Sequence, residues 1–169
     1  LYHRWGGLGN HRYQIGFSGD AVISWKSLDF QPYFNSTASN VLYGYWSHDL
    51  GGHFEADRID PEMFTRWMQF GAVSPVMRTH SSKSGVLNKE PWVFSPVYFN
   101  TIRNTILQRY EMAPYVYTMA RKTYDEGLSI CRPLYYDYPE SKEAYDYRNQ
   151  YMFGDQMLIA PVTAPMKGD

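Results

Sequence analysis

Three short apolar runs in the first half of the chain each lead to ionisable side chains. Residues 13–17 lead through a Ser-Gly turn to Asp20, residues 41–46 lead to His48 and Asp49, and residues 72–77 lead to Arg78 and His80. Reactive side chains in α/β barrels stand where the strands end. The pattern therefore indicates a sheet with a site along one edge, and Asp20 is its strongest candidate for chemistry.

Helical patterns separate these runs. We predict strands over 11–17, 41–46 and 72–77, a helix over 29–39, and a second helix that begins at Asp60-Pro61 and extends to Gly71. Asp is a good N-cap, and Pro is tolerated in the first helical turn because its missing N–H has no partner there. Strands that alternate with helices predict parallel βα units with right-handed crossovers.

The last third of the chain changes character. A helical pattern over 96–126 contains Pro114, so we expect a break near Met112 and an end at Gly127. Residues 130–138 are β-like, and residues 151–159 read as a strand, a Gly-Asp turn and a strand. This change predicts a first domain over 1–134 and the start of a β-rich domain over 135–169.

Composition excludes several function classes. The chain has 16 basic and 17 acidic residues without a long run of either, which argues against nucleic acid as a partner. No apolar run reaches membrane-spanning length, so no membrane partner is expected. The single Cys131 allows neither an internal disulfide nor a Cys-based zinc cluster, and the compartment stays open. The chain begins with Leu1, and we interpret it as a piece of a longer protein.

Asp20 has two readings of similar weight. A carboxyl at a strand end, bordered by Phe17 and Trp25, could be partly desolvated, and desolvation would raise its pKa and suit a general acid. Alternatively, Gly19-Asp20 is a turn in which the carboxylate caps its own backbone. The same choice applies to Asp49, which two glycines follow within a turn.

Three functions remain open at this point. Asp20 and Asp49 could form the acid and its partner in a glycosidase. A divalent metal could be held by side chains around the second run and activate water, and the strongest ligands for it would be His48, His53 and His80, with Asp49 and Asp57 beside them. The third possibility is non-catalytic: a sugar-binding lobe or a scaffold fragment without turnover. Aromatic residues make up 18% of the chain, and they can line a sugar pocket, although core packing is their more common role.

Several ordered blocks resemble one family, glycoside hydrolase family 31, the α-glucosidases and α-xylosidases. The blocks are Arg4, FSGDAVISW around Asp20, YGYWSHDLGGHF around Asp49, TRWMQFGAVSPVMRTH, EPW at 90–92, and QYMFGDQMLIAPV near the end. The resemblance implies the C-terminal half of a (β/α)8 TIM barrel, an α/β fold, followed by the start of a C-terminal β-domain. It also implies an oligosaccharide substrate and no cofactor.

The resemblance assigns roles to individual residues. It makes Asp20 the general acid/base and places Arg4, Asp49, Arg78 and His80 around sugar hydroxyls, with Phe17 counted among the substrate-binding residues. The nucleophilic Asp of the family lies on an earlier strand in a Trp-x-Asp segment that this chain lacks, so Asp49 would bind and not attack. The missing N-terminal half of the same polypeptide would then be a partner, and we expect the isolated chain to be inactive.

Overall fold

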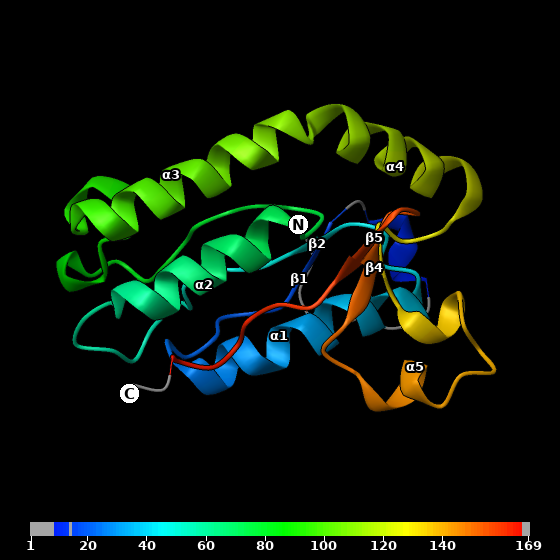
Figure 1. Ribbon diagram of the computed structural model, residues 1–169, viewed down its shortest axis with the longest axis horizontal. Helices are drawn as coiled ribbons and strands as arrows, with labels where there is room; N and C mark the ends of the chain where they lie inside the picture. The colour runs from blue at the N-terminus through cyan, green and yellow to red at the C-terminus, as the bar shows by residue number, and fades with distance from the viewer. Residues whose placement is uncertain (1–8, 14, 167–169) are drawn as a thin grey trace.

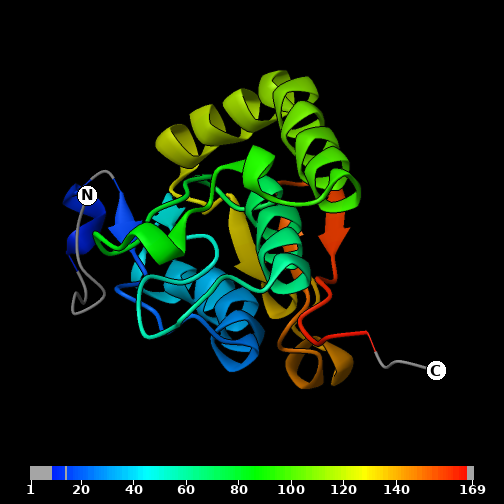
Figure 2. The same cartoon turned by 90° about the vertical axis from the view of Figure 1, so that its left-hand side faces the viewer.

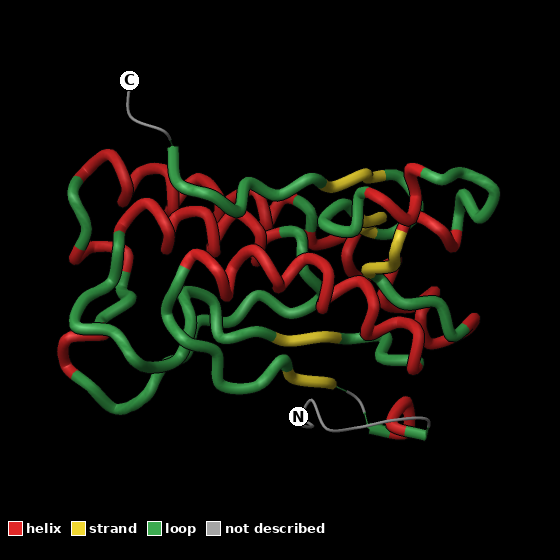
Figure 3. Tube along the Cα trace, turned by 90° about the horizontal axis from the view of Figure 1, so that it is seen from below, coloured by secondary structure: helices red, strands yellow, loops and turns green. Residues whose placement is uncertain are grey.

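Parallel extended segments form one side of the molecule in the computed structural model, which describes residues 9–13 and 15–166. β1 (Gly16–Phe17) pairs in parallel with β2 (Trp46–Ser47). Parallel bridges from Ser47 to Val76 and from Leu50 to Thr79 add residues 76–79 on the other side of β2. Figure 3 shows β1 and β2 side by side, away from the other strands of the described residues. The predicted parallel arrangement is confirmed.

The first two predicted strands are wrong in extent. The 3₁₀ helix η1 (Asn10–Arg12) occupies the start of the strand predicted over 11–17. Only the last two residues of that predicted strand form β1. In the second run, η2 (Ala38–Val41) is followed by Leu42 at φ 66°, and the Tyr43 N–H returns to the carbonyl of Ala38 at 3.2 Å. This helix-ending turn bends the chain, so only Trp46 of the run enters β2.

The predicted strand over 72–77 is also wrong, because its backbone is bonded elsewhere. Ala72 is the last residue of α2 (Pro61–Ala72). The Arg109 guanidinium donates to the carbonyls of Ala72, Ser74 and Pro75 at 2.8–2.9 Å. Carbonyls that accept from a side chain do not need a neighbouring strand. Pairing therefore begins only at Val76.

The predicted start of α2 is confirmed. The Asp60 side chain accepts from the N–H groups of Glu62 and Met63, and Pro61 is the first helical residue. α1 (Trp25–Thr37) begins earlier than the predicted residue 29, because the Ser24 hydroxyl caps it by accepting from the Ser27 N–H at 3.1 Å. Pro32 consequently lies inside α1 and not in its first turn.

The predicted break near Met112 is confirmed. α3 (Pro96–Glu111) ends there and α4 (Ala113–Glu126) begins, with Gly127 closing α4 at φ 75°. Figure 1 shows the two helices following one another as a bent pair along one side of the molecule. Two 3₁₀ turns, η3 (Gly85–Leu87) and η4 (Pro91–Val93), lie in the connection before α3.

The main core surrounds α2. Figures 1 and 2 show α2 between α3 and α1. Phe64 and Trp67 of α2 are fully buried, and so are Leu50 after β2 and Ile102 of α3. This packing holds the loops that follow β2 and α2 in place, which matters for the site below.

A second sheet forms the far end of the chain. β3 (Cys131–Pro133), β4 (Tyr151–Phe153) and β5 (Met157–Ile159) pair antiparallel in that order, with η5 (Leu134–Tyr136) and α5 (Glu143–Asp146) between β3 and β4. The predicted strand-turn-strand is confirmed, with Gly154 at φ 63° in its turn. β3 precedes and β4 follows the proposed boundary between 134 and 135, which stays a prediction. Among the described residues, no helix has the length and apolarity needed to cross a membrane.

Candidate active site

β1 ends in a turn that presents Asp20 to solvent. The Ser18 N–H donates to the Ser47 carbonyl at 3.0 Å and continues the parallel pairing, and Gly19 then turns the chain at φ 86°. The Asp20 side chain is 56% exposed. Trp25 points elsewhere, since its indole N–H donates to an Asp60 carboxylate oxygen at 3.3 Å. The expected desolvation of Asp20 is therefore wrong for the described residues.

Asp49, which follows β2, is buried and has a partner on each oxygen. Its side chain is fully shielded from solvent, with Oδ1 bonded to the Arg78 guanidinium and Oδ2 2.6 Å from Nδ1 of His53. A buried carboxylate requires such partners, because an unpaired charge in the interior is costly. Asp49 thus joins the two loops that carry Arg78 and His53.

Two glycines make the turn after Asp49 possible. Gly51 and Gly52 lie at φ 92° and 82°, and the Gly52 N–H donates to the Asp49 carbonyl at 2.8 Å. A Cβ on Gly52 would lie 2.7 Å from the backbone of Ile23. Gly52 therefore allows this loop to approach the loop after β1, which carries Asp20.

Arg78 lies between the strand ends. Its Nε donates to the Ser47 hydroxyl at 3.2 Å, and its guanidinium carbon lies 5.1 Å from the centre of the Phe17 ring. The Arg78 carbonyl accepts from the Leu50 N–H at 3.1 Å. The ends of β1, β2 and the segment 76–79 therefore meet at this side chain, as the three apolar runs predicted.

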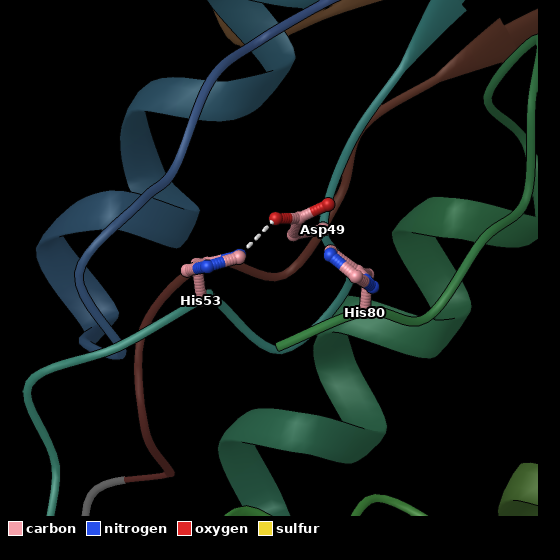
Figure 4. Close-up of side chains that lie close together, drawn as sticks. All are labelled: Asp49, His53 and His80. Atoms are coloured by element: carbon pink, nitrogen blue, oxygen red, sulfur yellow. Dashed lines mark hydrogen bonds and ion pairs between the residues drawn. The ribbon is translucent and has the colours of Figure 1, made fainter. Parts of the chain in front are cut away.

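Two histidines extend the cluster toward solvent. The rings of His53 and His80 lie 5.2 Å apart at 53°, His80 is exposed, and the His53 side chain is 16% exposed. Nε2 of His53 is 3.8 Å from Oδ2 of Asp20. Figure 4 shows Asp49, His53 and His80 close together from neighbouring loops. We refer to Asp20, Asp49, His53, Arg78 and His80 as the strand-end cluster.

Lys89 is a member of the site that the residue patterns missed. Its buried ammonium donates to the carbonyls of Gly52 and His80, and so connects the two loops that bear the histidines. Burial lowers the pKa of Lys89 to about 8, and the Asp49 carboxylate opposes that shift. The position of Lys89 directly before the Glu-Pro-Trp block could have drawn attention to it. Its partners could not be predicted from the sequence, because they are backbone carbonyls, which every residue has.

The metal site built on His48, His53 and His80 is wrong in its first member. His48 is fully buried, its Nδ1 lies 3.0 Å from Oε1 of Gln31, and its ring packs 5.0 Å from that of Phe70. Burial, with Arg78 nearby, lowers the pKa of His48 to about 3. This histidine is a neutral part of the core.

Asp49, His53 and His80 do offer ligand atoms within 4.8 Å of one another. The Asp49 carboxylate, however, already bonds Arg78 and His53. A divalent cation here would compete with a guanidinium for the same carboxylate and would be repelled by it. The contacts therefore favour a hydrogen-bonded ion network over a metal centre.

A cavity of about 840 Å³ adjoins the cluster. Its lining includes His80, Lys89, Met77, Ile106 and Tyr110, so it lies along the segment 75–81 and faces α3. Asp20 and Asp49 are not part of that lining. Arg4, the remaining predicted substrate contact, lies outside the described residues.

Comparison with protein families decides the class. Residues 1–119 match the glycosyl hydrolases family 31 TIM-barrel domain, and residues 127–169 match the glycosyl hydrolase family 31 C-terminal domain. The chain belongs to glycoside hydrolase family 31. The resemblance and the predicted fold, part of a TIM barrel followed by the C-terminal domain, are therefore confirmed.

Relatives in family 31 cover nearly all of the chain. It is 37% identical to an α-xylosidase of Saccharolobus solfataricus over 89% of its length, and 32% identical to alpha-glucosidase 2 of Bacillus thermoamyloliquefaciens over 98%. It spans only 21% of each relative. A crystal structure of a family 31 α-xylosidase from a soil metagenome, complexed with xylose, superimposes with a TM-score of 0.82 at 26% identity, covering 90% of this chain and 25% of the other.

Proposed function

We propose that this chain is part of a retaining, exo-acting α-glycosidase that removes terminal α-linked glucose or xylose from oligosaccharides. One observation carries the proposal: the exposed Asp20 carboxylate stands at the end of β1, beside the network of Asp49, Arg78 and His53. Strand ends are where barrel enzymes hold their reactive groups. The names of the family 31 relatives support glucose and xylose as the sugars.

In this proposal Asp20 acts twice. It first donates a proton to the glycosidic oxygen as the bond to the anomeric carbon breaks and a nucleophilic Asp outside this chain forms a covalent glycosyl-enzyme. The resulting Asp20 carboxylate then accepts a proton from water, whose oxygen attacks the anomeric carbon and releases the nucleophile. The exposure of Asp20 suits both steps, since the leaving group and the water must reach it.

The neighbouring residues bind the sugar. Arg78 and His80 would donate to hydroxyls of the terminal residue, Phe17 would pack beside Arg78, and Arg4 would add a further donor. Asp49 is shielded and bonded on both oxygens, so its contribution to binding runs through the orientation of Arg78 and His53. The isolated chain is proposed to be inactive, because the nucleophile and half of the subsite lie outside it.

The test uses the full-length polypeptide that carries this sequence. We expect Asp20→Ala to reduce kcat/KM about a thousandfold for phenyl α-glycosides, which need protonation, and far less for dinitrophenyl α-glycosides, which do not. The matched control is Asp125→Ala, because the partner of Asp125 among the described residues is Arg121, in an exposed ion pair on α4. Equal losses on both substrates would remove Asp20 from the acid role.

A further inference from the structure

We propose that His53 is the positioning residue for Asp20: it links the acid/base carboxyl to the buried Asp49–Arg78 pair and holds it at the reacting bond. The inference rests on the proposed function and deepens it. His53 contacts both acids at once, with Nδ1 2.6 Å from Asp49 and Nε2 3.8 Å from Asp20. Within the described part of the chain, this makes one imidazole the link between a shielded carboxylate and an exposed one.

The backbone fixes where the His53 ring begins. The His53 N–H donates to the carbonyl of Ala21, the residue after Asp20, at 2.6 Å. The His53 carbonyl accepts from the Ser82 N–H at 2.9 Å, and Phe54 forms a parallel bridge with Val22. The residue is therefore anchored on both sides, and its side chain starts beside the turn that carries Asp20.

The Asp49 carboxylate then fixes the proton on the ring. A carboxylate only accepts hydrogen bonds, so the His53 nitrogen that faces it, Nδ1, carries a hydrogen. Arg78 holds the other oxygen of Asp49, which keeps that carboxylate from turning away. Nε2 is left to face Asp20, alongside the ring of His80.

That orientation suits both states of Asp20 in the reaction. A neutral imidazole presents a lone pair at Nε2, which accepts from the hydroxyl of protonated Asp20. A charged imidazolium presents an N–H there, which donates to the ionised carboxylate. The distance of 3.8 Å exceeds a hydrogen bond, and catalytic hydrogen bonds in unliganded enzymes commonly tighten when substrate binds.

Three substitutions separate the two contacts of the ring. In His53→Gln the side-chain amide reaches the position of Nε2 and can still bond Asp20, whereas in His53→Asn it reaches only the position of Nδ1 and can bond Asp49. His53→Phe keeps the ring and loses both. His11→Asn is the control, because His11 is exposed and lies in η1, outside the strand-end cluster.

Each variant is made in the full-length polypeptide and assayed with phenyl and dinitrophenyl α-glucosides and α-xylosides. We expect His53→Phe and His53→Asn to lose about a hundredfold in kcat/KM on the phenyl substrates and less than about threefold on the dinitrophenyl ones, the size of effect that follows from misplacing a reacting group. His53→Gln should keep phenyl activity within about tenfold of the parent. In the double variant, His53→Phe should not lower kcat/KM below the value of Asp20→Ala alone.

The outcomes separate the two proposals. If Asp20→Ala discriminates between the substrates and His53→Phe does not, the role of His53 is wrong and the proposed function stands. If His53→Asn retains activity better than His53→Gln, the ring serves only Asp49, and the link to Asp20 is refuted. If Asp20→Ala lowers kcat/KM equally on both kinds of substrate, the proposed function fails and the role of His53 fails with it.

Discussion

Two ion networks among the described residues each surround one shielded charge, and they differ in where their members lie in the fold. In the strand-end cluster the shielded member is an anion, Asp49, and its partners lead outward to His80 and Asp20, which are exposed. In the second sheet the shielded member is a cation, Arg132, with a side chain only 8% exposed.

Arg132 is satisfied locally. It bonds both oxygens of Asp137 at 2.9 and 3.0 Å, and Asp155 at 3.3 Å, which Lys122 also holds at 2.8 Å. These partners join β3 to the hairpin turn after β4 and to α4. Asp137 and Asp155 are partly exposed, as His53 and Arg78 are, so exposure alone does not separate the two networks. Their places in the fold do differ, since the strand-end cluster lies where parallel segments end, which is where barrel enzymes hold reactive groups. We therefore expect the first network to serve function and the second to serve stability.

The largest expected effect comes from removing the buried charge in each network. Asp49→Asn leaves Arg78 without its counter-charge, so we expect unfolding free energy to fall by about 3–5 kcal/mol and kcat/KM by at least about a hundredfold. Arg132→Met should cost less stability, about 1 kcal/mol, because Asp137 and Asp155 are partly exposed and Asp155 keeps Lys122, and it should leave kcat/KM of the folded enzyme within about twofold. Denaturant titrations and steady-state kinetics of both variants measure this. If Asp49→Asn and Arg132→Met had equal kcat/KM, the proposed difference between the two networks would be wrong.

An outward-facing member provides the second test. His80→Ala removes the proposed donor to the sugar without touching the Asp49–Arg78 pair, so we expect a loss of about 2–4 kcal/mol in kcat/KM with little change in unfolding midpoint. His11→Ala, on an exposed residue of η1, is the control. A loss of stability without a loss of kcat/KM would make His80 structural.

The smallest expected effect concerns His48, which lies beside the network and faces the core. Because burial lowers its pKa to about 3 from 6.5, the unfolded chain binds more protons between those values, and stability falls as pH falls through that window. The slope that His48 adds is at most about 1.4 kcal/mol per pH unit. His48→Gln should flatten the curve below pH of about 6.5 relative to the parent, with pH 8 as the reference where the imidazole is neutral in both states. An unchanged slope would mean that His48 is not buried as a neutral ring.

Local signals explain which parts of the fold were predictable. The start of α2 follows from the Asp60-Pro61 cap, and the break at Met112 follows from Pro114 two residues later. Apolar runs predict the bounds of strands less well, because the sequence of a run does not show which groups its backbone carbonyls bond. Arg109 takes three carbonyls of the run over 72–77, and Leu42 at φ 66° turns the run over 41–46 out of the sheet.

The residues of the site also fall into those that the sequence could predict and those that it could not. The convergence of Asp20, Asp49 and Arg78 could be predicted, because consecutive parallel strands end at one edge. The role of Lys89 could not, because it bonds carbonyls that every residue carries. His53 entered only as a metal-ligand candidate, since its two contacts depend on how closely the glycine turn approaches the loop after β1.

The central claim is that Asp20 is the acid/base of a retaining enzyme and not its nucleophile. The most direct measurement is the configuration of the product when Asp20→Ala in the full-length polypeptide is supplied with azide and a dinitrophenyl α-glycoside. With the nucleophile intact, the sugar is held through its β face, and azide enters the space left by Asp20 from the α face. The account predicts an α-glycosyl azide, identified by the proton NMR coupling of its anomeric hydrogen. A β-glycosyl azide would show that azide had replaced a missing nucleophile, and that Asp20 was that nucleophile.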